Sequence, residues 1–281
     1  MEKSDFAKLV SRWNHKRKMK VQARRLTQQM APRLKFAPEG NNERVQAALS
    51  FLQPKSCGIE LIRIGPDNDG GYLLPNDLED IAALFSPGVS DTLGFDVEIA
   101  RRGIPCFLAD ASVSPPTDLL ENMEFIQKFI GASDDNSFIT MEAWMSGRAP
   151  ENHDLMLQMD IEGAEYDVLS ELTEEQIQRF RIIVIEFHHL HEIFDAEHAK
   201  AMTRVFEKLS RTHVPCHVHA NNVVAYFEWE GLTVPPVIEV SYIRKDRVKK
   251  LGEAQIPHPL DQCNNPKLPD VPTPAFWQAN P

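Results

Sequence analysis

The chain contains 281 residues, and 42% of them are hydrophobic, which is enough to build a large domain around a buried core and excludes a mainly disordered protein. Its formal net charge of −11 argues against a surface built as a whole to bind nucleic acid, so no nucleic-acid partner is expected. The four cysteines form no CxxC pair, which predicts reduced thiols, as is usual in a cytoplasmic protein. The sequence contains no apolar stretch long enough to span a bilayer.

The first 54 residues are predicted to form a basic helical arm. Residues 1–35 carry eleven Lys and Arg against two acidic residues, a net charge of +9 that leaves −20 for the rest of the chain. Apolar residues recur at near-helical spacing between residues 4 and 31, and a second helix is predicted over 43–52. Such an arm suits either docking on the acidic remainder of the chain or an anionic partner, such as an acidic glycan or a membrane surface to which this cytoplasmic protein would bind peripherally.

Beyond residue 55, short apolar runs alternate with helical segments, which is typical of a parallel sheet with crossover helices. The predicted strands span 81–87, 104–109, 124–130, 155–160, 181–188, 214–219 and 237–243. The predicted helices span 94–103, 116–122, 140–146, 164–172 and 195–211. Since no long helix separates the last two strands, the last strand is expected to be antiparallel. The pattern therefore predicts an α/β, Rossmann-like domain over 55–250 with a seven-stranded, mostly parallel sheet.

The tail, residues 251–281, is rich in proline, with seven of the 20 prolines at or after position 256. Proline fixes φ and lacks a backbone N–H donor, so the tail is expected to run over the surface in extended form.

Polar residues follow the first two predicted strands, at the edge where parallel sheets bind ligands. Ser86, Gly88 and Asp91 follow the first strand, and Asp110 ends the second strand 22 residues after Gly88. This spacing resembles nucleoside binding in a βαβ unit, where a glycine admits the ligand and an acidic residue holds the ribose hydroxyls. The full G-x-G-x-x-G of dinucleotide sites is missing, which favours S-adenosylmethionine over NAD.

The fourth predicted strand leads into the most specific motif. In the segment LMLQMDIEGAEYDVL, a predicted strand ends at Asp160, a turn follows at Glu162 and Gly163, and a helix begins near Glu165. This D-x-E-G-x-E pattern resembles the FkbM family of S-adenosylmethionine-dependent methyltransferases. The segments RIGPDNDGGY, SPGVSD, VIEFH and HANN extend the resemblance over about residues 60–245, whereas the first loop lacks the acidic residue and two glycines usual in the family.

The resemblance implies a class I methyltransferase fold, S-adenosylmethionine as cofactor, and methyl transfer to a hydroxyl of a sugar, glycan or glycosylated metabolite. The expected cofactor-binding residues are Asp69, Gly70, Gly71, Ser86, Gly88, Asp91, Asp110, Asp134 and Asp160. The segment from Asp67 to Tyr72 would also form a hairpin turn without any ligand, because D-G and G-G pairs supply positive φ.

His188 is the predicted general base, because an unperturbed histidine pKa of about 6.5 suits proton removal at neutral pH. Asp160 or Glu162 is expected to orient it as part of the catalytic set. The expected contacts to the acceptor are Glu186, His219, Asn221 and Asn222. Structural roles would also explain the last three, as a packed core histidine and as turn caps.

Two other functions fit the same residues. A metal-dependent hydrolase would use Asp160, Glu186, His188 and His219 as ligands of a divalent ion. A non-catalytic binding module would use the basic arm to dock anionic partners. Because Mg²⁺ prefers an all-oxygen shell and this cluster contains imidazole, a base is favoured over a metal, and a divalent cation is the less favoured second cofactor.

Overall fold

The computed structural model describes residues 42–89, 93–271, 273, 274 and 277. The helix predicted over 4–31 and the loop residue Asp91 lie outside the described residues. All four cysteines are free thiols.

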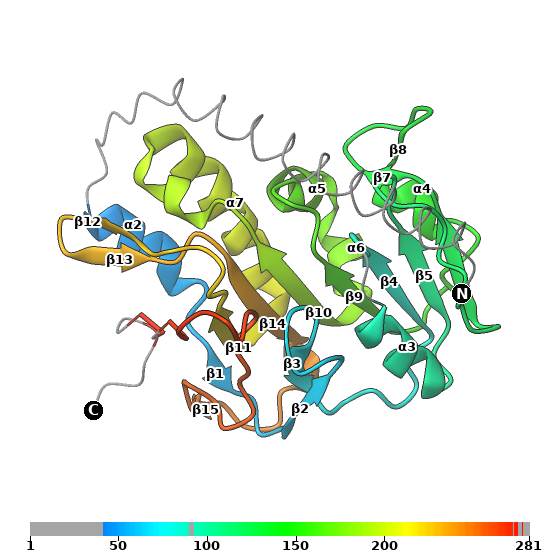
Figure 1. The fold of residues 1–281 in the computed structure, drawn as a ribbon, viewed down its shortest axis with the longest axis horizontal. Coiled ribbons are helices and arrows are strands. Elements are labelled where there is room, and N and C mark those ends of the chain that lie inside the picture. Colours follow the sequence, from blue (N-terminus) through cyan, green and yellow to red (C-terminus); the bar gives the residue numbers. More distant parts are fainter. Residues whose placement is uncertain (1–41, 90–92, 272, 275–276, 278–281) are drawn as a thin grey trace, which may run out of the picture. The chain divides into compact units, whose positions relative to one another are not determined.

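The core of the structure is a seven-stranded sheet in the order β11-β14-β10-β9-β4-β5-β6 (Figure 1). Its strands are β4 (Ala83–Pro87), β5 (Cys106–Ala109), β6 (Met123–Ile126), β9 (Leu155–Met159), β10 (Phe180–Phe187), β11 (His213–Ala220) and β14 (Ile238–Arg244). Neighbours from β6 to β10 run parallel, whereas β14 is antiparallel to both β10 and β11. The predicted α/β sheet with its last strand antiparallel is therefore confirmed.

The predicted third strand, 124–130, is divided in the structure. Its first half forms β6 at the edge of the sheet, and β7 (Phe129–Ile130) instead pairs with β8 (Phe138–Ile139) outside the sheet.

The helices follow the predicted crossovers with one exception. They are α2 (Asn42–Ser50), α3 (Gly94–Arg101), α4 (Met141–Met145), α5 (Glu165–Glu171), α6 (Glu174–Gln178) and α7 (Ala196–Thr212), with 3₁₀ turns η2 (Leu190–Phe194) and η3 (Lys245–Arg247). The predicted helix at 116–122 is wrong. Because a residue before a proline avoids helical backbone, Ser114 and Pro115 cannot extend such a helix, and the chain is already extended again at Met123. Asp195 caps α7, and its carboxylate accepts from the N–H groups of Glu197 and His198.

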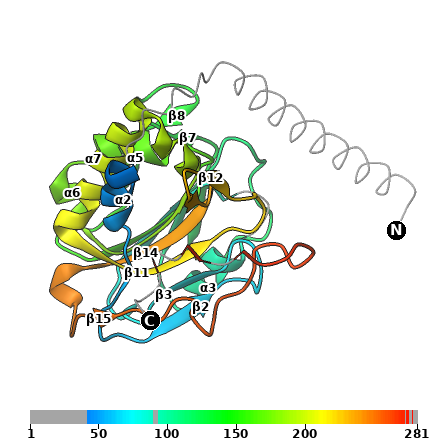
Figure 2. The same cartoon turned by 90° about the vertical axis from the view of Figure 1, so that its left-hand side faces the viewer.

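Two apolar clusters lie on the two faces of the sheet, as alternate residues of β10 illustrate. Ile183 and Ile185 point to a cluster that includes α2, α4, α5 and α7, while Ile182 and Val184 point to a cluster that includes α3 and the β2–β3 hairpin. Figure 2 shows α2, α5, α6 and α7 on one side of the sheet and α3 with β2 and β3 on the other. Burial of both faces explains why the strand sequences are nearly continuous apolar runs.

Three small antiparallel pairs surround the sheet: β1 (Lys55–Ser56) with β15 (Gly252–Glu253), β2 (Leu61–Ile64) with β3 (Tyr72–Pro75), and β12 (Phe227–Trp229) with β13 (Leu232–Val234). The turn between β2 and β3 confirms the hairpin expected from the DNDGGY segment.

Both ends of the described chain pack against the sheet layers. Val45 and Leu49 of α2 are fully buried, so this helix belongs with the sheet although it was grouped with the arm in the predicted domain division. The segment 254–271 forms no helix or strand, and Trp277 is buried beside α2. No helix among the described residues is long and apolar enough to cross a membrane.

Candidate functional site

The candidate site lies where the strand order of the sheet reverses. From β4 the chain adds β5 and β6 on one side, and it then returns to add β9 and β10 on the other side. Open α/β sheets bind ligands outside the carboxyl ends of the strands at such a switch point. The D-x-E-G-x-E loop follows β9 at this edge, and His188 follows β10.

Gly88 lets the loops after β4 and β9 pack against each other. Its φ is +86°, and a Cβ at this position would lie 1.6 Å from the carbonyl oxygen of Asp160. Asp160 in turn donates its N–H to the carbonyl of Pro87 (3.2 Å). The need for glycine is therefore explained by a contact within the protein, although the sequence suggested the approach of a ligand.

The side chain of Glu165 holds the D-x-E-G-x-E loop in place through hydrogen bonds to its backbone. Its side chain is fully buried at the start of α5, and Oε1 accepts the N–H groups of Ile161 and Gly163, both at 3.1 Å. Negative charge at a helix N-terminus is favourable. The same oxygen lies 3.0 Å from Nδ1 of His188, so the loop and the histidine are held by one carboxylate.

His188 therefore presents its other ring nitrogen, Nε2, to three carboxylates. Nε2 lies 3.8 Å from Asp160 Oδ1, 3.6 Å from Glu162 Oε2 and 3.8 Å from Glu186 Oε1. Asp160, Glu162 and His188, the three predicted catalytic residues, are thus brought together.

The charge state of His188 differs from the one expected of a general base. Burial alone lowers the pKa of His188, but the hydrogen bond to Glu165 and the charges of Asp160 and Glu162 outweigh burial and raise the pKa to about 9. The imidazole is then protonated at neutral pH and donates its protons. It cannot accept a proton as a general base in this state.

A row of polar side chains crosses three neighbouring strands on the face that carries the β2–β3 hairpin. Glu186 of β10 is the register partner of Glu239 in β14, which is in turn the partner of His219 in β11. Nδ1 of His219 lies 3.5 Å from Glu239 Oε2. Asn221 donates to Glu186 Oε1 at 3.0 Å. Glu239 was missed by the sequence reasoning, although it is the one charged residue in the apolar run VIEVSYI.

The hairpin turn brings Asp69 to this row. Asn264 of the tail donates to both Asp69 (3.3 Å) and Glu239. Burial, together with the charges of Glu239 and Asp69, raises the pKa of Glu186 well above its usual value. Burial and the charge of Glu186 do the same to the pKa of Asp160.

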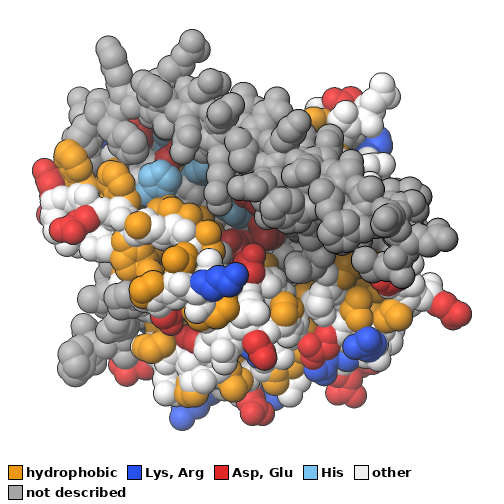
Figure 3. Space-filling model, in the orientation of Figure 1, with side chains coloured by type: hydrophobic (Ala, Val, Ile, Leu, Met, Phe, Trp, Pro, Cys, Tyr) orange, Lys and Arg blue, Asp and Glu red, His pale blue; other side chains and the backbone are white. Residues whose placement is uncertain are grey.

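The acidic cluster consists of Asp69, Asp160, Glu162, Glu165, Glu186 and Glu239 around His188 and His219. Figure 3 shows acidic side chains gathered near the middle of one face of the molecule, beside histidine side chains. A cation at this site would relieve the repulsion between the acids that raises the pKa values of Asp160 and Glu186.

The remaining predicted cofactor residues are more dispersed. Ser86 is fully buried and donates to Gln158 (2.7 Å), and Gly71 is needed because a Cβ there would lie 1.9 Å from the carbonyl oxygen of Pro66. Asp110 is 5% exposed at the end of β5. Asp134 is exposed and accepts the N–H of Thr140 at 2.8 Å, which orders the start of α4.

The two predicted asparagines differ in their surroundings. Asn221 holds Glu186 and also caps a turn through the N–H of Val223. The side chain of Asn222 donates to the carbonyls of Asn265 and Pro269 and accepts the N–H of Asn265, so it anchors the tail.

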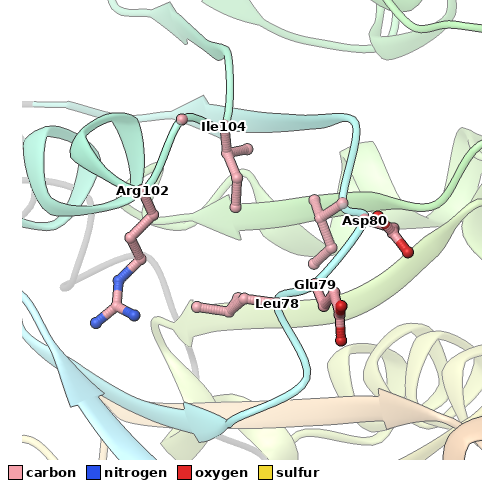
Figure 4. Close-up of a pocket in the computed structure, with 7 residues that line it drawn as sticks. Leu78, Glu79, Asp80, Arg102 and Ile104 are labelled. Atoms are coloured by element: carbon pink, nitrogen blue, oxygen red, sulfur yellow. The ribbon is translucent and has the colours of Figure 1, made fainter.

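A pocket of about 370 Å³ lies away from this cluster (Figure 4). Leu78, Glu79, Asp80, Arg102 and Ile104, which precede β4 and β5, contribute to its lining. It opens at the amino edge of the sheet, opposite the edge where α/β folds bind their ligands, and we do not assign the chemistry to it.

A comparison with protein families matches the part of the chain that contains Asp160, Glu186 and His188. Residues 141–211 match the family described as Methyltransferase FkbM domain. The match runs from α4 through α7 and includes the D-x-E-G-x-E loop, β10 and His188. The chain has no match among curated proteins. The motif, the sheet order and the family match agree, and residues 141–211 are similar to an FkbM methyltransferase domain.

Proposed function

We propose that this protein is an S-adenosylmethionine-dependent O-methyltransferase that acts on a hydroxyl of a sugar, glycan or glycosylated metabolite. The observation that carries the proposal is the cluster around His188 at the switch point of the sheet, inside the matched domain. The family match favours group transfer over the metal-dependent hydrolase and the non-catalytic binding module.

The chemistry of the site fits the cofactor. S-adenosylmethionine carries a positively charged sulfonium and an ammonium group, and when bound it supplies a methyl group activated for transfer. Carboxylates in excess at the ends of β9 and β10 suit these cations. Asp110 directly follows β5, and its proposed role is to bind the ribose hydroxyls in the manner of nucleotide-binding α/β folds.

The residues around His188 suit an acceptor that carries several hydroxyls. Glu186, His219 and Asn221 offer hydrogen-bond donors and acceptors within a short distance of one another. Protonated His188 holds the neighbouring carboxylates in place, and Asp160 or Glu162, rather than His188, accepts the hydroxyl proton at neutral pH. Transfer then depends mostly on holding oxygen, methyl and sulfur in line.

Two measurements test the proposal. Calorimetry with S-adenosylmethionine and its demethylated product should show binding to the full chain. A panel of glycosides incubated with methyl-labelled cofactor should yield a labelled acceptor. Absence of binding by either compound would overturn the proposal.

Asp110→Asn tests the cofactor side of the site. Loss of charge-assisted hydrogen bonds to the ribose should weaken cofactor binding about 10- to 100-fold. Asp118→Asn, at an exposed position in the following loop, is the matched control and should bind as the wild type does. Equal affinities for all three proteins, each shown to be folded by circular dichroism, would remove Asp110 from the cofactor site.

A further inference from the structure

We propose that Asp160, Glu186 and His188 bind a divalent cation of the Mn²⁺ or Zn²⁺ type. Each of the three offers one ligand atom, and these atoms all lie within 4.8 Å of one another. Among the described residues, no other set of three such side chains comes this close. The catalytic role of the ion rests on the proposed function, whereas the binding of the ion to these three residues does not depend on that function.

The spacing of the three atoms suits an ion between them. Ligand atoms about 2.1 Å from a common ion lie roughly 3 to 4.2 Å apart, depending on the coordination geometry. Nε2 of His188 lies 3.8 Å from both Asp160 Oδ1 and Glu186 Oε1. These distances are too long for hydrogen bonds but fall within the range for a shared ion.

An unsatisfied buried oxygen points independently to a ligand. Oε2 of Glu186 is buried, and no described residue offers it a hydrogen-bond partner. The side chain is 5% exposed, so bulk water does not compensate it. Leaving a buried carboxylate oxygen without a partner is unfavourable, and a cation that Glu186 bound through both of its oxygens would satisfy Oε2 while contacting Oε1, the oxygen nearer to His188.

Groups behind the three ligands already hold them in a binding orientation. Glu165 accepts from Nδ1 of His188, which turns Nε2 toward Asp160 and Glu186. A bound ion would displace the proton that Nε2 carries in the metal-free protein, and Nδ1 would keep its own proton for Glu165. Two backbone N–H groups fix Glu165, and Asn221 fixes Glu186. A carboxylate behind a histidine is the usual support of a metal-bound imidazole, because it sets the tautomer and the ring orientation.

The donor set decides the kind of ion. One imidazole nitrogen with two carboxylate oxygens is unfavourable for Mg²⁺, which prefers oxygen ligands alone, but it is common for Mn²⁺ and Zn²⁺. Two carboxylates neutralise the charge of the ion and leave coordination positions for an acceptor. A hydroxyl bound there would lose its proton more easily, and Glu162, exposed beside Nε2 of His188, would remain to accept it.

Metal binding is tested on the full-length protein after treatment with a chelator, without any cofactor. Mn²⁺ binding is followed by the loss of the free-ion signal in electron paramagnetic resonance, and Zn²⁺ binding by calorimetry. We expect one ion per chain, with affinity reduced at least tenfold in Glu186→Gln and in His188→Gln. Glu165→Gln should weaken binding about 10- to 100-fold while leaving all three ligands present. Glu171→Gln, an exposed carboxylate on α5, should bind as the wild type does.

The outcomes separate this inference from the proposed function. No binding of either ion, or binding that Glu186→Gln and His188→Gln leave unchanged, would overturn the metal site. Circular dichroism on the same samples shows whether each variant is folded, and calorimetry with S-adenosylmethionine follows cofactor binding separately. Cofactor binding without metal binding contradicts the metal site alone, and metal binding without cofactor binding contradicts the proposed function alone.

Discussion

At the scale of single residues, His188 shows how neighbours change a side chain's role. A histidine at the end of a strand suggests a general base, but four carboxylates lie within 4 Å of its ring nitrogens. Their charges stabilise the imidazolium, and the cation in turn stabilises the folded arrangement of the acids. Two consequences can be measured at this scale.

The first is a pH dependence of stability in chelator-treated protein. The pKa of His188 is about 9 in the folded protein and about 6.5 when unfolded, so its contribution is complete below pH 6.5 and is lost as the pH rises through 9. The free energy of unfolding should therefore fall by about 2 to 3 kcal/mol over this range. Denaturant titrations of His188→Gln should show a smaller fall, and His153→Gln, at the opposite edge of the sheet, should follow the wild type. Parallel pH profiles for all three proteins would contradict the prediction.

The second consequence concerns Gly88. Any side chain there would meet the backbone of Asp160, in addition to the strain of a φ of +86°. Gly88→Ala should lower the free energy of unfolding by about 3 kcal/mol or more. Gly103→Ala is a matched control, because its φ is +87° but nothing lies within 4 Å of its Cβ position, and it should cost about 1 kcal/mol. Similar losses in thermal or denaturant unfolding would show that the contact with Asp160 is unimportant.

At the scale of elements, the segments before and after the sheet depend on each other. Leu49 of α2 and Trp277 of the tail are both buried in one apolar cluster. Gln53 donates to the carbonyl of Trp277 (3.1 Å), and the indole N–H reaches the carbonyl of Leu49. The tail also contributes Asn264 and Asp261, which bond to Glu239 and His217 in the strands. It is therefore part of the structure that surrounds the site.

Trp277→Ala tests this coupling. Removing a fully buried indole should lower the free energy of unfolding by about 3 to 5 kcal/mol. Leu268→Ala changes a tail residue that is 42% exposed and should cost less than about 1 kcal/mol. If both substitutions prove equally mild in denaturant titrations, the tail does not stabilise α2.

At the scale of the whole molecule, charge is distributed unevenly along the chain. Residues 1–35 carry a net charge of +9, while the remainder carries −20. The acidic cluster described above belongs to the second part, so cofactor and metal binding are assigned to residues outside the basic segment. The basic segment is proposed to bind an anionic membrane surface, on the basis of its sequence.

Deletion of residues 1–35 separates these two roles. The shortened protein should bind S-adenosylmethionine with unchanged affinity in calorimetry. In liposome flotation the full chain should bind vesicles with anionic lipid at low salt and be released at high salt, because ions screen the attraction. The shortened protein should not float. Flotation that is independent of anionic lipid would exclude an electrostatic membrane contact.

The sequence alone predicted the elements of the sheet well, because most of the strands are short apolar runs that are buried on both faces. Every predicted strand range overlaps a strand of the seven-stranded sheet, and helices are found at four of the five predicted crossover positions. The failure at 116–122 and the division of 124–130 both concern the edge of the sheet. There burial is lower and the pattern is less constrained by packing.

For the site, the sequence determined the D-x-E-G-x-E loop and His188, because local spacing alone places them at the ends of two strands. Only the tertiary structure decided the contributions of Glu239 and Asp69, because strand register and a hairpin turn bring these distant residues to Glu186. It also decided the charge of His188, since a pKa depends on burial and on neighbours that the sequence does not place. The grouping of residues that are close in the sequence could thus be predicted from the sequence. The grouping of residues on different strands could be seen only in the folded structure.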